Sequence, residues 1–153
     1  MLRNTYEGQV CSIARSLELI GERWTLLIVR DIFRGQRRFD ALQRDLGIAR
    51  NVLANRLDRL VEEEILVKRP YQERPPRYEY LLTEKGIDLW PVLVSLVKWG
   101  DKHEPGGDGP PVVVRHKACG GEIDDHFTCQ ACGERVWARQ AYVERRLPIE
   151  AAA

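Results

Sequence analysis

Residues 37–82 read RRFDALQRDLGIARNVLANRLDRLVEEEILVKRPYQERPPRYEYLL, and this stretch decides the fold. A short helix is expected over residues 39–46, and Gly47 supplies a tight turn after it. A second helix is expected over residues 50–63, because leucines at 53, 57 and 60 recur at helical spacing. Helix, glycine turn and helix of these lengths are typical of a helix-turn-helix.

A basic β-hairpin is expected directly after the second helix. Residues 65–70 and 77–82 have strand character, and the segment 72–76 between them is rich in turn residues. A hairpin in this position has the layout of a wing. The motif therefore predicts a winged helix-turn-helix, mainly α with a small β wing (α+β).

Further helices are expected on both sides of this motif. They cover residues 11–20, 23–33 and, after a capping Thr83, one long helix to about His103 that Pro91 should kink. The last helix carries two apolar stripes, Ile87, Trp90, Val94 and Val97 on one side and Leu89, Val92, Leu96 and Trp99 on the other. One stripe can cover its own domain, and the second indicates a homodimer. The alternative is that both stripes are buried within the chain.

A small second unit is expected at the C-terminal end. Residues 104–111 read EPGGDGPP, which is the composition of a linker. The expected organisation is a DNA-binding and dimerisation domain over residues 1–104, a linker over 105–111 and a zinc-ribbon-like unit over 112–153.

The unit after the linker contains two metal-ligand pairs. His116-x2-Cys119 and Cys129-x2-Cys132 have the spacing of a zinc ribbon, with histidine in place of the usual first cysteine. Four protein ligands leave no position for water, so the expected role of Zn²⁺ is structural. Two alternatives stay open: His126 competes as a ligand, or the cysteines pack without a metal.

The charge distribution fits a polyanionic partner in one part of the chain. The whole chain has a formal net charge of +1, but residues 34–77 hold 11 Lys and Arg against 7 Asp and Glu. A solvated charged face explains this excess equally well. No apolar run approaches the roughly 20 residues of a membrane span, and the N-terminus lacks a secretory apolar region, so a cytoplasmic protein without a membrane partner is expected.

The outward face of the second helix is the expected reader of DNA bases. With the leucine stripe inward, Arg50, Asn51 and Asn55 lie near the end that enters the major groove. Cations around the motif can contact phosphates or a neighbouring minor groove. The complete set of candidate DNA-binding residues is Arg37, Arg38, Arg50, Asn51, Asn55, Arg56, Arg59, Arg74 and Arg77. An ordinary solvated helix face is the alternative.

Five segments together resemble the HxlR-type branch of the winged-helix regulators, relatives of the MarR type. They are IGERWTLLI at 20–28, RRF at 37–39, NVLANRL at 51–57, RPPRYEY at 74–80 and LTEKG at 82–86. The resemblance covers residues 11–99. It implies a transcription regulator that dimerises through its terminal helices and binds operator DNA. We expect a repressor on a pseudo-palindromic operator, by the geometry of two-fold helix-turn-helix dimers, with a small-molecule or redox effector as a further candidate partner.

Cys11 stands apart from the metal-ligand pairs, at the start of the first helix. A helix N-terminus activates a thiol, and some members of the family sense oxidants through a cysteine in this region. The family often has Cys-Pro where this chain has Cys11-Ser12. The favoured alternative to a redox sensor is a buried, small apolar residue near the dimer interface.

The sequence predicts no enzyme, because a phosphate-binding glycine loop and a catalytic constellation are both missing. The main rival to a sequence-specific regulator is a winged-helix module that binds other proteins. Operator binding distinguishes the two.

Overall fold

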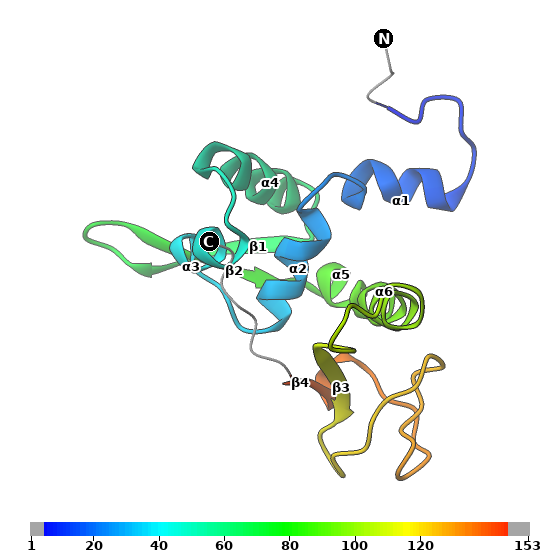
Figure 1. Cartoon of the computed structure of the whole chain (residues 1–153). Helices are drawn as coiled ribbons and strands as arrows, with labels where there is room; N and C mark the ends of the chain where they lie inside the picture. Colours follow the sequence, from blue (N-terminus) through cyan, green and yellow to red (C-terminus); the bar gives the residue numbers. More distant parts are fainter. Residues whose placement is uncertain (1–4, 147–153) are drawn as a thin grey trace. The chain divides into compact units, whose positions relative to one another are not determined.

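The computed structural model describes residues 5–146, and the chain divides into two compact units, Met1–Gly86 and Ile87–Ala153 (Figure 1). The division lies before the last long helix, whereas the glycine- and proline-rich segment follows that helix. The first unit contains the helix-turn-helix and the wing. The second contains the last helix together with the metal-ligand pairs.

The first unit follows the predicted order of helices and strands. Its elements are α1 (Ser12–Ile20), α2 (Thr25–Phe33), α3 (Phe39–Leu46), α4 (Arg50–Glu62), β1 (Leu66–Gln72) and β2 (Arg77–Leu82), and the short α5 (Glu84–Ile87) follows. Gly47 joins α3 to α4 with φ 63°, a left-handed conformation that glycine adopts without a steric penalty. The predicted winged helix-turn-helix is confirmed.

The core of the first unit lies among α2, α3, α4 and the start of β1. The predicted stripe of Leu53, Leu57 and Leu60 is at most 1% exposed. Ile28 of α2 and Leu42 of α3 are fully buried as well. Burying one stripe of α4 leaves its opposite side to solvent, which decides the face that a ligand can reach.

The wing is an antiparallel pair of strands that extends beyond the helices (Figure 1). Leu66 pairs with Leu82 at its base. The segment before α3 adds to the other edge of β2, because Arg38 bridges to Glu79 and the Tyr80 N–H donates to the Arg37 carbonyl at 2.7 Å. The start of the helix-turn-helix is thereby attached to the wing.

The predicted single helix from Thr83 to His103 is wrong. Thr83 caps only α5, where its Oγ1 accepts a hydrogen bond from the Gly86 N–H at 3.1 Å, and a second helix, α6 (Trp90–His103), begins after a break. Pro91 lies in the first turn of α6, where its missing N–H leaves no internal bond unmade. The proline therefore starts a helix, and the expected kink does not form.

The second unit combines α6 with a small ribbon. The ribbon consists of β3 (Val112–His116), a 3-10 turn at Ala138–Gln140 and β4 (Ala141–Arg145), and the two strands pair antiparallel. Val113, Ile123 and Val136 are at most 3% exposed and form a small core beneath the loops. This unit thus has buried apolar residues in addition to its metal ligands.

Within residues 5–146, none of the helices combines the length and the apolar character that crossing a membrane requires.

Candidate DNA interface and metal centre

The exposed side of α4 carries amides and cations. Asn51, Asn55, Asp58 and Arg59 are exposed, opposite the buried leucine stripe. Amide and guanidinium groups can each make two hydrogen bonds to a base edge, with adenine and guanine respectively. The helix therefore presents the groups for major-groove readout on its accessible face.

Arg50 is placed at the first residue of α4 by contacts with α3. Its guanidinium lies 4.7 Å from the Phe39 ring centroid and its Nη1 lies 3.9 Å from Asp40 Oδ1. The side chain remains 74% exposed. Both contacts are at the surface, so DNA can replace the Asp40 contact at little cost.

Two other arginines of α4 bind acidic side chains of the protein. Arg56 forms an ion pair with Glu22, and its Nε is buried without a hydrogen-bond partner among the described residues. Arg59 pairs with Glu63 at 2.7 Å, one helical turn away. The position of Arg56 favours a role in holding the segment before α2, while Arg59 stays half-exposed.

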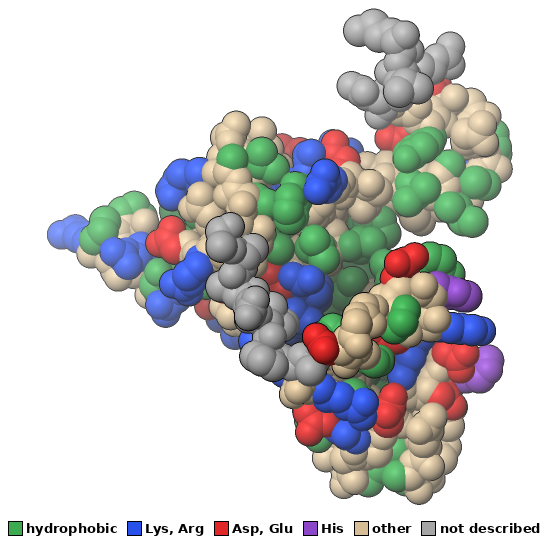
Figure 2. Space-filling view, viewed as in Figure 1, with side chains coloured by type: hydrophobic (Ala, Val, Ile, Leu, Met, Phe, Trp, Pro, Cys, Tyr) green, Lys and Arg blue, Asp and Glu red, His purple; other side chains and the backbone are tan. Residues whose placement is uncertain are grey.

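Cations also gather along the wing, where the hairpin carries Lys and Arg side chains out to its end (Figure 2). Arg74 and Arg77 are exposed there. Arg69 donates two hydrogen bonds to Glu79 Oε1, at 2.6 and 3.1 Å, and this contact lowers the pKa of Glu79. The phosphate or minor-groove contact of these two exposed arginines stays a prediction.

Arg37 and Arg38 lie at the start of α3, with Arg38 as its N-cap residue, and also beside this hairpin. The Arg38 guanidinium stacks 4.3 Å from the ring centroid of Tyr71, a β1 residue that the sequence did not single out. Arg37 is exposed, and its positive charge adds to that of Arg69 in lowering the Glu79 pKa. Both cations therefore share one basic surface with the wing.

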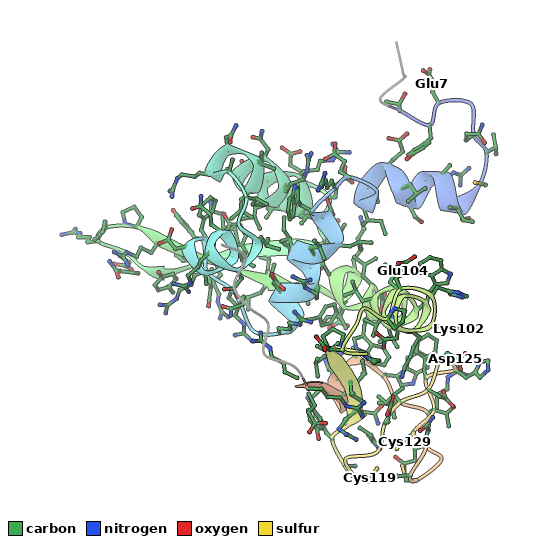
Figure 3. The ribbon with its side chains drawn as sticks, viewed as in Figure 1. Glu7, Lys102, Glu104, Cys119, Asp125 and Cys129 are labelled. Atoms are coloured by element: carbon green, nitrogen blue, oxygen red, sulfur yellow. The ribbon has the colours of Figure 1, made fainter. Side chains whose placement is uncertain are left out.

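The predicted metal ligands converge in the second unit. The ligand atoms of His116, Cys119, Cys129 and Cys132 all lie within 4.8 Å of one another. His116 Nδ1 is 3.5 Å from Cys119 Sγ and 3.4 Å from Cys132 Sγ, and the Cys119 and Cys129 sulfurs are 3.4 Å apart. Figure 3 shows the labelled Cys119 and Cys129 on loops at the same end of the ribbon.

These separations fit a tetrahedral metal ion. Zn–S bonds of about 2.3 Å and a Zn–N bond of about 2.05 Å place sulfurs about 3.8 Å apart and nitrogen about 3.6 Å from sulfur. The three distances given above are each slightly shorter, at 3.4 to 3.5 Å. Three thiols and an imidazole are also the donors that zinc prefers. The residues can therefore hold one zinc ion with no position left for water.

Backbone groups of the second pair prepare its sulfur for a metal. The N–H groups of Cys132 and Ala131 donate to Cys129, and together with the neighbouring Cys119 and Cys132 thiols they lower the Cys129 pKa to about 6 despite burial. The same donors favour a thiolate, which is the form that binds a metal.

Close packing of a glycine fixes the first loop against this sulfur. A Cβ on Gly121 would lie 2.4 Å from Cys129 Sγ and 2.6 Å from Ala131 Cβ, so no larger residue fits without a shift. The Gly121 carbonyl accepts from the His116 N–H at 2.9 Å. The sequence signal for this role is the Gly-Gly pair that follows Cys119.

His126 lies outside the cluster, so the competing-ligand alternative is wrong for this structure. Its side chain is 86% exposed and its Nε2 faces Asp125 at 3.7 Å. Glu134 instead approaches the ligand His116, with 3.8 Å between its Oε2 and the histidine Nε2. A carboxylate on that side can orient the imidazole of a metal-bound histidine.

Both terminal helices of the described chain expose apolar side chains. Ile13 of α1 is 73% exposed, although the helical pattern placed it with the buried Ile20. Val92, Leu96 and Trp99 of α6 line a shallow groove together with Pro91 and Ser95. Trp90 and Val94 of the same helix are buried. The first predicted stripe is thus buried at Trp90 and Val94 and half-buried at its two ends, while the second is exposed at Val92, Leu96 and Trp99.

Comparisons with known proteins agree on the class of helix-turn-helix transcription regulators. The sequence pattern of the HxlR-like helix-turn-helix family matches residues 19–107. The chain is 47% identical, over 143 residues, to an uncharacterized HTH-type transcriptional regulator of Mycobacterium tuberculosis, and the match spans 94% of this chain and 89% of that protein.

Two solved structures cover different shares of the chain. The crystal structure of PA1607, a candidate transcription factor, is 36% identical in sequence with a TM-score of 0.71, and the match covers 90% of this chain and 96% of that one. The redox regulator HypR in its oxidized form is 28% identical with a TM-score of 0.57 and covers 61% of this chain and 98% of its own.

Proposed function

This chain belongs to the HxlR-like helix-turn-helix family of transcription regulators, and we propose that it is a repressor that binds a specific double-stranded DNA site as a homodimer. The observation that carries this proposal is the exposed N-terminal part of α4. Asn51 and Asn55 lie there on the side opposite the buried leucines, and Arg50 lies exposed at the first residue of the helix, on its flank. In helix-turn-helix proteins this part of the second helix reads bases in the major groove.

The wing and the residues beside it supply the contacts that position the protein. Arg74 and Arg77 of the hairpin meet phosphates or a minor groove, and Arg37 and Arg38 meet phosphates near the start of α3. Arg59 contributes from the far end of α4. Arg56 belongs to the proposed set only if DNA displaces Glu22, its present ion-pair partner.

Selection of bound fragments from the source genome, at a stated salt concentration, tests this proposal. The dimer should enrich a pseudo-palindromic site with half-sites about 34 Å apart, one helical turn. A reporter behind such a site should be silenced by the protein, since a repressor is proposed. A pool in which no sequence is enriched would support the rival proposal, a winged-helix module that binds proteins.

Two substitutions separate base readout from backbone contact. Asn51→Ala should relax base preference, at a cost of about 1–3 kcal/mol for its preferred site. Arg77→Ala should weaken binding to all DNA sequences alike. It should also reduce the slope of log affinity against log salt concentration by about one. Binding isotherms at several salt concentrations measure both effects. Equal losses on specific and random DNA for Asn51→Ala would remove it from the base-reading set.

Homodimer formation is proposed from the open apolar faces. Ile13 and Leu17 of α1, and Val92, Leu96 and Trp99 of α6, are all more than a third exposed in the single chain. Exposed apolar residues that lie along one helix, as on α6, mark a protein interface more often than a solvated surface. A second copy also suits the pseudo-palindromic site, because a two-fold dimer presents two equivalent α4 helices.

A structural zinc ion is proposed for the cluster of His116, Cys119, Cys129 and Cys132. Structural zinc contributes on the order of 10 kcal/mol to small metal-binding units. Protein purified without chelators or metal-binding tags should contain one zinc per chain. A zinc content near zero with an ordered ribbon would assign its folding to Val113, Ile123 and Val136 alone.

Cys11 is proposed as a redox-responsive thiol. The likeness of the chain to the redox regulator HypR, solved in its oxidized form, supports this proposal. Cys11 is exposed at the N-cap of α1, where its Sγ accepts a hydrogen bond from the Ala14 N–H at 3.3 Å. Mild oxidant should change DNA affinity in the wild type and not in Cys11→Ser. An equal response in both proteins would place the sensing elsewhere.

A further inference from the structure

Helix α6 and the metal-binding loops are in contact within the second unit. The rings of Trp90 and Phe127 lie 5.9 Å apart between centroids at 46°. Lys98 Nζ lies 3.2 Å from Glu122 Oε1, and the same carboxylate faces Arg146 at 3.7 Å. The glycine- and proline-rich segment 104–111 therefore joins α6 to a ribbon that contacts it, and it does not keep the two apart.

Both contact residues of the ribbon lie in the loop between two metal ligands. Glu122 and Phe127 fall between Cys119 and Cys129. Phe127 adopts φ 61°, an unfavourable backbone conformation for a bulky residue, so its loop must hold it there. The Phe127 carbonyl accepts from the Val136 N–H at 2.8 Å, and the Glu122 carbonyl accepts from the Gln130 N–H at 2.9 Å.

This loop is anchored at both ends by the metal-ligand segments. Gly121, next to Glu122, packs directly on Cys129 Sγ, and its carbonyl accepts a hydrogen bond from the His116 N–H. Gln130 lies between Cys129 and Cys132. Movement of the ligand segments after metal loss must therefore shift the two side chains that contact α6.

We propose that the ribbon is a metal-dependent brace on α6: the metal fixes Glu122 and Phe127, and these residues hold Lys98 and Trp90 of the helix. Since α6 also exposes the Val92, Leu96 and Trp99 groove, metal occupancy controls the surface proposed for dimerisation. The inference rests on the proposed zinc site and deepens it, because it assigns the ion a regulatory effect on assembly and DNA binding.

Amide hydrogen exchange of residues 90–103 tests the brace in the full-length protein. Removing zinc with a chelator should speed exchange in α6 by roughly tenfold or more while α2–α4 keep their protection. Phe127→Ala retains every ligand and should still bind one zinc. It should nevertheless speed α6 exchange by about three- to tenfold, as expected for the loss of one aromatic pair.

His126→Ala is the matched control. It changes the neighbouring side chain, which is exposed and outside the cluster, so zinc content and α6 exchange should equal those of the wild type. Sedimentation of the same proteins should show a weaker dimer after chelation and in Phe127→Ala, but not in His126→Ala.

The possible failures are distinguishable. A chain that takes up no zinc overturns the metal proposal and the metal control of α6 together. A zinc-loaded chain whose α6 exchange ignores both chelation and Phe127→Ala overturns the brace and leaves the zinc site standing. Exchange that responds in α6 while the protein sediments as a monomer supports the brace and contradicts the dimer.

Discussion

Gly121 has a chemical role that its lack of a side chain makes possible. The backbone passes close enough to Cys129 that even a methyl group would overlap the sulfur, with a Cβ–Sγ distance of 2.4 Å. Cys129 is 1% exposed, so its sulfur is enclosed, and the added Cβ would also lie 2.6 Å from the Cβ of Ala131. A glycine at this position therefore leaves room for the sulfur of a proposed metal ligand.

Gly121→Ala should therefore weaken metal binding. Because the methyl group displaces Cys129, zinc affinity should fall by roughly tenfold or more, comparable to the loss of a residue that orients a ligand. Competition with a chromophoric chelator measures the change. Gly107→Ala is the control, since a Cβ there meets nothing within 4 Å and it should bind zinc like the wild type. Unchanged affinity in both variants would show that the loop opens without cost.

Among the elements, those with a strong local pattern were predicted well. α3 and β2 begin and end at the predicted residues, and the Leu53, Leu57 and Leu60 stripe is buried as expected. The break between α5 and α6 was missed because residues 84–103 have a helical pattern throughout, and the kink was placed at Pro91 when the proline starts a new helix.

Contacts between distant elements were beyond a reading of local pattern. The metal-ligand spacing correctly predicted that His116, Cys119, Cys129 and Cys132 lie close together. The stacking of Arg38 on Tyr71 and the ion pair of Arg56 with Glu22 depend on tertiary packing, which spacing along the chain does not encode. Helix periodicity placed Ile13 with Ile20, but only packing decides that Ile13 stays open.

The wing contains a carboxylate whose ionisation stabilises the hairpin. Hydrogen bonds from Arg69, assisted by the charges of Arg37 and Arg38, lower the Glu79 pKa below its ordinary value. A lowered folded-state pKa contributes stability that is present above the unfolded pKa, about 4.3, and is lost as the pH falls through the folded pKa.

Glu79→Gln should accordingly lower the Tm at pH 7 and have a smaller effect near pH 3, where the wild-type carboxyl is itself becoming neutral. Thermal unfolding of both proteins across this range measures the difference. Glu73→Gln, an exposed change in the same hairpin, should show no comparable pH dependence. A Glu79→Gln effect that is constant from pH 7 to pH 3 would assign the role of Glu79 to packing and not to charge.

At the scale of the whole molecule, the two units divide the proposed work. The unit Met1–Gly86 carries the candidate DNA-reading residues, and the unit Ile87–Ala153 carries α6 and the candidate metal centre. The placement of α6 in the same unit as the ribbon agrees with both proposals for this helix: the ribbon supports one side, and the other side contacts a second copy of the chain. Trp99 lies on that open side and is 61% exposed, with its ring 5.1 Å from His103.

Trp99→Asp should convert the dimer into a monomer that binds DNA weakly. A large aromatic residue in the centre of an interface typically contributes about 2 kcal/mol or more to the free energy of association. The Kd of the dimer should therefore rise at least about 30-fold. The monomer loses the second α4 helix, and its affinity for a pseudo-palindromic site should fall with it. Trp137→Asp makes the same change at another exposed tryptophan, outside α6, and should leave the dimer intact. Sedimentation at micromolar concentration separates the two variants, and a wild-type protein that is already monomeric there would refute the role of this face in assembly.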